Sequence, residues 1–132
     1  MAGVFAQEGD TVLLDTLLAN QSMKLYLYTN NYTPLVTSVF ANFTMATQAG
    51  LVTPITLTAG SWNASTIVSS KAVATYSDQT FTNTGSSSTI YGYVLANTGG
   101  TKVFAAELFA TPRTLATSDS LVISPSMSLV SQ

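Results

Sequence analysis

The sequence predicts a mainly β fold, an antiparallel β-sandwich of jelly-roll-like or immunoglobulin-like type, with one short N-terminal helix. Seven or eight short runs rich in strand-forming residues are separated by turn residues, which is typical of a sandwich. Helical periodicity is confined to the first twenty residues. A length of 132 residues suits one hydrophobic core. We therefore expect a single β-sandwich domain over residues 1–132, of which residues 1–9 could form an N-terminal arm.

The helix is expected in the segment GDTVLLDTLLAN, residues 9–20. Its four leucines form two pairs with a spacing of four residues, so each pair stacks on one side of a helix. Asp10 precedes the apolar run and is expected to be the N-cap, where its negative charge suits a helix start. Strict alternation, which a half-buried strand requires, is missing here.

The remaining chain shows strand patterns. The predicted strands are residues 22–29, 37–44, 51–58, 65–76, 88–96, 101–110 and 120–131. Pro54 indicates that the third of them lies at a sheet edge, because proline cannot donate a ladder hydrogen bond. Pro125 indicates a kink or an edge position in the last one. The segment around Gly85 is expected to be a loop.

The clearest unit is a β-hairpin around Asn97-Thr98-Gly99-Gly100. The two glycines can adopt a positive φ without steric cost, as tight hairpin turns require. Gly92 lies inside the first strand of this hairpin, between two tyrosines. We expect a crossing strand or an aromatic ring to approach the backbone closely at this position.

The stretch Leu25-Tyr26-Leu27-Tyr28 places apolar groups on both faces of one strand. A sandwich buries one face of each sheet, so one alternating pair packs inward. The other pair needs a second cover. The N-terminal helix could supply it from the same chain, or a neighbouring subunit could supply it from outside.

Composition excludes several classes of function. Only 8% of the residues are charged, and sixteen Ser and twenty-one Thr take their place at the surface. The four basic residues are scattered singly, whereas a nucleic-acid surface needs a cluster. The sequence has no signal-peptide pattern and no apolar run long enough to span a membrane. Because Cys and His are missing, we expect no metal site, and nothing indicates a cofactor.

An enzyme is not expected. The chain has six carboxylates, and a glycosidase needs two of them at a fixed distance in a cleft. Asp10 as a helix cap, Asp119 in a turn and Asp78 in a polar turn have sufficient local roles.

Glu107 and Arg113 have two interpretations. Glu107 shares a strand face with apolar residues, so it is either a solvated, cross-strand paired residue or one half of an ion pair with a partner chain. Arg113 has the same ambiguity. The tyrosines within strands favour packing over sugar binding, whereas Tyr32 is the best candidate for an exposed aromatic side chain.

The whole chain resembles a group of small structural proteins from the virions of tailed bacteriophages. The resemblance lies in the order of segments: EGDTVLLDTLLAN, LYLYTNNYTP, FANFTMAT, the single Trp62, the Tyr-Gly-Tyr hairpin and DSLVISPSMSLV. It spans most of the chain and involves no catalytic signature. Some proteins of this group are cement or decoration proteins on the capsid.

The resemblance implies a capsid cement or decoration protein that binds the outside of the head at capsomer junctions. Its partners would be the major capsid protein and itself, as a homodimer or homotrimer, without nucleic acid or membrane. It would reside on the capsid surface of the virion after assembly in the host cytoplasm. The expected interface residues are Val4, Phe5, Tyr26, Tyr28, Asn31, Tyr32, Asn97, Thr98, Glu107 and Arg113. The alternative is a tail or fibre component that binds a host-surface receptor or glycan, through aromatic residues near Tyr32 or Trp62.

Overall fold

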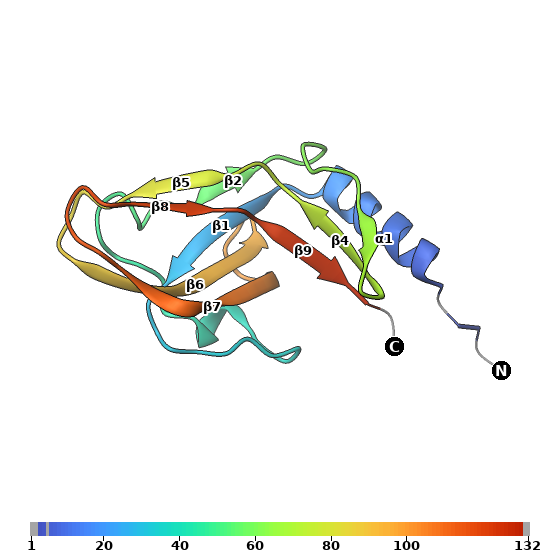
Figure 1. Cartoon of the computed structure of the whole chain (residues 1–132), viewed down its shortest axis with the longest axis horizontal. Coiled ribbons are helices and arrows are strands. Elements are labelled where there is room, and N and C mark those ends of the chain that lie inside the picture. Colours follow the sequence, from blue (N-terminus) through green and yellow to red (C-terminus); the bar gives the residue numbers. More distant parts are fainter. Residues whose placement is uncertain (1–2, 5, 131–132) are drawn as a thin grey trace. The chain divides into compact units, whose positions relative to one another are not determined.

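The computed structural model describes residues 3–4 and 6–130 (Figure 1). It confirms a mainly β, antiparallel fold with one short N-terminal helix. The chain forms two compact units. Unit 1 comprises Met1–Ser22, Thr58–Asp78 and Ser124–Gln132, and unit 2 comprises Met23–Leu57 and Gln79–Ile123. The single domain expected from the sequence stays a prediction.

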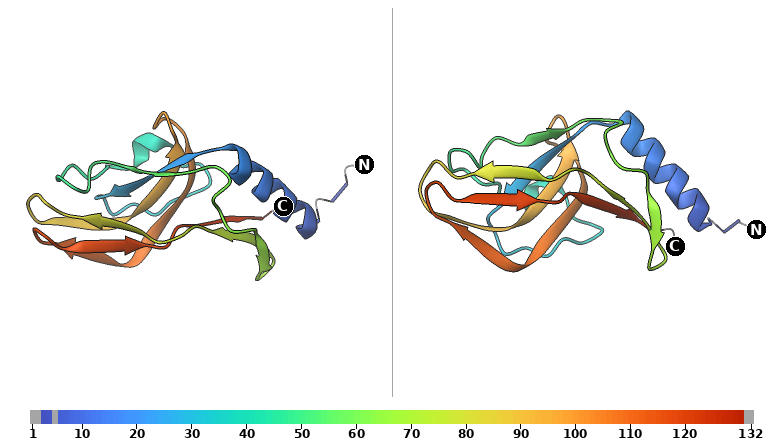
Figure 2. Two further views of the ribbon diagram at one scale, coloured as in Figure 1. Left: turned by 90° about the horizontal axis from the view of Figure 1, so that it is seen from above. Right: turned by 45° about the horizontal axis from the view of Figure 1, so that its top comes forward.

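Unit 1 contains the helix and a small sheet. Its elements are α1 (Gln7–Asn20), β3 (Thr66–Val68), β4 (Lys71–Thr75) and β9 (Ser126–Leu129). The strands pair antiparallel in the order β3-β4-β9, and the β3–β4 hairpin runs beside α1 (Figure 2). Leu14 and Leu18, one of the predicted leucine pairs, are buried. The apolar side of the helix therefore packs on its own unit.

The predicted helix cap is wrong. The helix begins three residues before Asp10, with Ala6 as N-cap, and the Asp10 amide donates a hydrogen bond to the Ala6 carbonyl at 3.1 Å. Gln7 and Glu8 are good helix formers, and the charge of Glu8 suits the first turn. Residues 7–9 of the expected arm are consequently helical.

The segment 65–76, predicted as one strand, is a hairpin of β3 and β4. Ser69 and Ser70 form its turn with φ of 49° and 66°. Two consecutive positive φ values fit the right-handed twist of a tight hairpin. Serine seldom adopts this conformation, so the sequence carries no turn signal here.

Unit 2 contains two antiparallel sheets. One sheet has the order β2-β1-β6-β7 and the other pairs β5 with β8. The strands are β1 (Met23–Tyr28), β2 (Ile55–Leu57), β5 (Gln79–Thr82), β6 (Ser88–Asn97), β7 (Val103–Leu115) and β8 (Ser120–Ile123). β2 lies at a sheet edge, which confirms the expectation from Pro54. The predicted β-hairpin is confirmed as β6 and β7 (Figure 1).

The strand β1 is covered on both faces within unit 2. Leu25 and Leu27 are buried on one face. On the other face, Tyr26 meets Phe40 and Tyr28 meets Phe43 in edge-to-face contacts, with ring centroids 5.3 and 5.0 Å apart. The second cover is thus the segment 29–46 of the same chain, and not the helix or the neighbouring subunit that the sequence suggested.

That covering segment overturns the strand predicted at residues 37–44. It contains only a short 3₁₀ turn, η1 (Phe40–Asn42). The Asn42 side chain accepts a hydrogen bond from the Val39 amide at 2.8 Å. Such a local side-chain bond competes with strand formation. Phe43 belongs to the buried cluster on the sheet and Phe40 packs against it, and their spacing of three residues fits a turn and not a strand.

The final predicted strand is divided and a preceding strand was missed. The strand is interrupted at Ser124 and Pro125, between β8 and β9, because proline has no amide proton for the ladder. The alternating residues Leu121, Ile123 and Met127 of this segment are buried. β5, in a region expected to be a loop, exists because it pairs with β8 over four residues.

Gly92 confirms the expected close approach. It lies opposite Tyr28 of β1 and Leu108 of β7. A Cβ atom at this position would lie 2.6 Å from the Tyr28 hydroxyl and 2.7 Å from Tyr28 Cε1, and still closer to the carbonyl oxygen of Glu107. The glycine leaves room for the buried Tyr28 ring.

Candidate functional site

The most distinctive surface of unit 2 is the segment 29–46, and asparagine side chains hold its base together. Asn30 Oδ1 accepts a hydrogen bond from the Thr44 amide at 2.8 Å, and Asn30 Nδ2 donates to the Asn42 carbonyl at 2.9 Å. The Thr29 amide donates to the Thr44 carbonyl at 2.7 Å. These bonds close the loop without a charge.

A tyrosine and a serine fix the middle of the same loop. The Tyr28 hydroxyl donates to the Tyr32 carbonyl at 3.0 Å. The Tyr32 and Ser38 hydroxyls are 2.8 Å apart, and Ser38 Oγ accepts from the Leu35 amide at 2.8 Å. Tyr32 also packs its ring edge-to-face on Phe43, with centroids 5.1 Å apart. The loop is therefore ordered by its own side chains.

This ordered loop presents aliphatic side chains to solvent. Val36 is fully exposed, Leu35 is 63% exposed and Val39 is 57% exposed. No charged residue stands between Lys24 and Lys71 in the sequence. We call Leu35, Val36 and Val39 the aliphatic loop. Exposed aliphatic groups on a fixed backbone suit contact with another apolar surface, because little conformational entropy is left to lose.

Four expected interface residues lie in or under this loop, and they differ in accessibility. Tyr28 is fully buried, so its prediction as an interface residue is wrong for the side chain. Tyr26 and Tyr32 are half-buried, and Asn31 is exposed. Tyr32 is therefore less exposed than expected, because its ring covers Phe43. Burial raises the pKa of Tyr28 to about 12, and the negative charge of Glu107 adds to the rise.

The tip of the β6–β7 hairpin lies beside the same loop. A Cβ atom on Gly100 would be 2.8 Å from the Tyr26 hydroxyl and 3.9 Å from Phe40. The Asn97 side chain is used within the hairpin, since its Oδ1 accepts from the amides of Thr101 and Lys102 at 2.8 and 2.9 Å. Only Thr98 of the two expected tip residues offers an exposed side chain.

The two N-terminal residues of the expected interface belong to unit 1. Val4 is 96% exposed, which leaves it available for a contact. Phe5 lies outside the described residues. The expected interface role of Val4 and Phe5 therefore stays a prediction.

Glu107 and Arg113 line one cleft of unit 2, of about 260 Å³. Glu107 is the cross-strand neighbour of Tyr93, whose hydroxyl donates to Glu107 Oε2 at 3.0 Å. The cross-strand partner of Glu107 is thus a tyrosine and not a basic residue, and the ion pair with a partner chain stays a prediction. Phe109 of β7 and Val122 of β8 contribute apolar surface to the same cleft.

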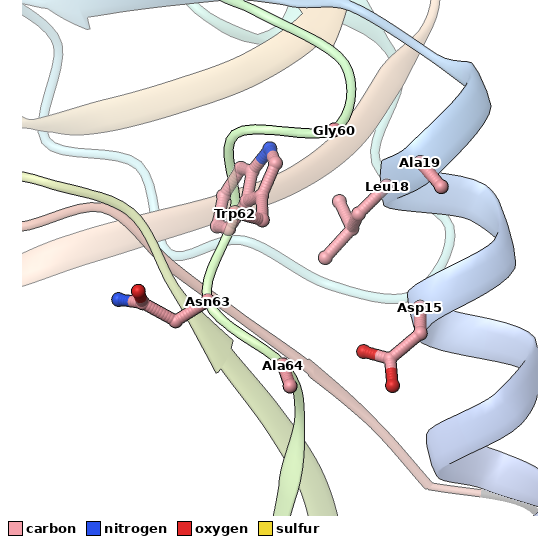
Figure 3. Close-up of a pocket in the computed structure, with 7 residues that line it drawn as sticks. All are labelled: Asp15, Leu18, Ala19, Gly60, Trp62, Asn63 and Ala64. Atoms are coloured by element: carbon pink, nitrogen blue, oxygen red, sulfur yellow. The ribbon is translucent and has the colours of Figure 1, made fainter.

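A second pocket, of about 270 Å³, lies in unit 1 between α1 and the loop that carries Trp62 (Figure 3). Asp15 and Leu18 project from the helix toward this loop. Asp15 Oδ1 accepts a hydrogen bond from the Ser65 amide at 2.8 Å. The Trp62 ring packs on Tyr76 with centroids 5.2 Å apart, and its Nε1 is buried without a hydrogen-bond partner in the described structure.

Metal sites and membrane-spanning helices are two further features to consider in the described part of the chain. No group of three or more His, Cys, Asp or Glu side chains is placed to hold a metal ion there. No helix in that part of the chain is both long and apolar enough to cross a bilayer. We found no match to this chain among protein-family models, curated proteins or solved structures.

Sequence reasoning missed the aliphatic loop and the contribution of β8 to the cleft that Glu107 and Arg113 line, whereas it did name Trp62 of the second pocket. A signal for the loop was available, because Leu35, Val36 and Val39 lie in a stretch without any charge. The pattern assigned Val39 to a strand, which hid its exposure. No local signal placed Val122 beside Glu107, since only the tertiary fold brings β7 and β8 to one cleft.

Proposed function

We propose that this chain is a phage capsid cement or decoration protein, which binds the outer surface of the head at capsomer junctions by non-covalent contacts. The aliphatic loop is the observation that carries the proposal. It combines three exposed aliphatic residues with a backbone held by side-chain hydrogen bonds. We propose the capsid as the partner because the sequence resembles small virion proteins. The uncharged loop fits a contact formed by apolar burial.

A joint of this kind works by repetition. One specific contact buries on the order of a thousand Å², and many identical contacts on one shell act together through multivalency. Fully burying one Val or Leu side chain is worth roughly 1.5–3 kcal/mol. Because Val36 is fully exposed in the free protein, its burial against the capsid can contribute near that range.

The test is binding of the purified protein to heads from which it has been removed. Val36→Ser should weaken binding by roughly 1–2 kcal/mol, which is about 5- to 30-fold in Kd. Val52→Ser is the matched control, because Val52 is a 49% exposed valine of the same unit outside the aliphatic loop. Equal binding by both variants, or binding to host cells while heads are ignored, would refute the proposal.

A second candidate function is a tail or fibre component that binds a host-surface glycan. The observation that favours it is the pocket at Trp62, which also includes Asp15 and Asn63. An aromatic ring beside carboxylate and amide oxygens is a combination that sugars can use. Because Trp62 is the only tryptophan, its fluorescence reports directly on this pocket. Titration with host-surface oligosaccharides should change the emission, and Asp15→Asn should weaken the effect; an unchanged emission throughout would exclude this candidate.

A further inference from the structure

The cleft between β7 and β8 concentrates charge in a chain that has very little. The whole sequence has ten charged residues, and Glu107 and Arg113, of opposite sign, line this one cleft. Both side chains are exposed. The apolar residues Phe109, Leu121 and Val122 line the same cleft, and Val122 is 56% exposed.

The two charges have different surroundings. Glu107 is oriented by the hydrogen bond from the Tyr93 hydroxyl to its Oε2, while the residue as a whole remains exposed. The Arg113 guanidinium has no hydrogen-bond or ion-pair partner among the residues that the structure describes. An oriented carboxylate and an unpartnered guanidinium therefore face solvent from the same strand.

The strand β7 is a sheet edge, but its backbone is poorly suited to extend the sheet. The pairing of β6 with β7 shifts between Ile90 and Gly92, which leaves residues 109–112 of β7 in a bulge. Pro112 in this bulge has no amide proton. Bulges and prolines are features that protect an edge strand from pairing with another chain. A partner at this edge must therefore use side chains instead of a backbone ladder.

We propose that the β7–β8 cleft is the contact surface for a second copy of this chain, arranged about a two-fold axis near Ala110. In a two-fold contact, each residue pair occurs twice with the roles exchanged. Glu107 and Arg113 lie three residues before and after Ala110. An antiparallel arrangement about this centre places Glu107 opposite Arg113 of the second copy, and Arg113 opposite its Glu107.

The character of the patch supports a second copy over an unrelated protein. A self-contact requires one surface to carry both charges of each pair, and this one does. Ala110 at the centre is small and exposed, so two copies can approach closely. Phe109 and Val122 give an apolar middle between charged ends, which is the usual arrangement of a protein interface.

The proposal names the surface for self-association, whereas capsid binding uses the aliphatic loop. It can therefore be tested in solution without heads, so that its failure and a failure of the cement proposal are distinguishable. Sedimentation velocity over a concentration series measures the monomer–dimer equilibrium. We expect wild-type protein to form a reversible dimer.

Charge reversal tests whether Glu107 of one copy pairs with Arg113 of the other. Glu107→Arg leaves two positive residues on each surface, and Arg113→Glu leaves two negative ones, so each single variant should dimerise at least about a hundredfold more weakly. An equimolar mixture of the two single variants should form heterodimers, because every opposed pair is then complementary. The double variant Glu107→Arg with Arg113→Glu should again form homodimers.

Controls separate charge pairing from folding and from net charge. Lys71→Glu changes the net charge as Arg113→Glu does, at an exposed residue of unit 1, and should leave dimerisation unchanged. Near-UV circular dichroism checks that each variant is folded. If a reversal variant is unfolded, the neutral variants Glu107→Gln and Arg113→Gln should each weaken the dimer. A monomeric wild type, single variants that dimerise normally, or a mixture that fails to pair would overturn the proposal.

Discussion

The substitution Gly92→Ala tests how unit 2 accommodates Tyr28. The added Cβ atom would lie 2.6 Å from the Tyr28 hydroxyl and 2.7 Å from Cε1, and closer still to the Glu107 carbonyl oxygen. Tyr28 is fully buried, so its ring cannot swing into solvent. Either the ring or the β6–β7 pairing must shift.

The magnitude follows from two contributions. Overpacking in a closed core costs about 1–3 kcal/mol. A displaced Tyr28 ring also loses its hydrogen bond to the Tyr32 carbonyl, which is worth about 1 kcal/mol. We therefore expect the free energy of unfolding to fall by about 3 kcal/mol, equivalent to a decrease in Tm of roughly 12–24 °C for a unit of this size.

Urea denaturation followed by near-UV circular dichroism is a suitable assay, because five of the six tyrosines belong to unit 2. Gly99→Ala is the matched control in the same hairpin. A Cβ atom on Gly99 has its nearest neighbour at 3.9 Å, so its effect should stay within about 0.5 kcal/mol. If both variants have the same urea midpoint of unfolding as the wild type, the close packing of Tyr28 against Gly92 is not needed for the stability of this core.

Three further predictions concern a buried amide, a buried phenol and the response to salt. Asn83 is fully buried, and its Nδ2 donates to the carbonyls of Ser86 and Leu115 at 2.8 and 2.9 Å. Asn83→Ala should lower the free energy of unfolding by about 3 kcal/mol, because these carbonyls lose their donor. Thermal or urea melts measure this change. Burial raises the pKa of Tyr28 from 10.0 to about 12, so its protonated form stabilises the fold below pH 10 and that contribution is lost as the pH rises toward 12. Urea melts between pH 9 and 12 should show this loss in the wild type, and Tyr28→Phe should be less sensitive to pH over the same range. Attachment to heads through the uncharged aliphatic loop should change little between low and moderate ionic strength, and release by modest salt alone would contradict an apolar joint.

Local sequence patterns predicted the elements that are determined by residues close together in the sequence. The helix was predicted from its leucine spacing, and burial of Leu14 and Leu18 agrees with it. The β6–β7 hairpin was predicted from its Gly99-Gly100 turn, and the close approach at Gly92 from the missing side chain. Of the candidate interface, Glu107 and Arg113 were singled out by sequence because a charge among apolar residues is conspicuous.

Elements with a non-local cause were missed. β5 depends on its ladder with β8, which a local pattern cannot reveal. The alternation at residues 37–44 indicates a strand, yet Asn42 bonds to the backbone there and Phe43 packs against Tyr28. The hairpin turn at Ser69 and Ser70 uses a conformation that serine rarely adopts.

By itself, the sequence determined that this is a mainly β chain with one short helix and very few charges, because composition and periodicity depend only on the order of residues. The tertiary structure decided what covers the tyrosine face of β1 and which residues share a cleft. Tyr26 and Tyr28 are covered by residues 29–46, and Glu107 and Arg113 line one cleft between β7 and β8. Such relations depend on how separate segments pack together, and several arrangements of the same alternating strands satisfy the local pattern equally well.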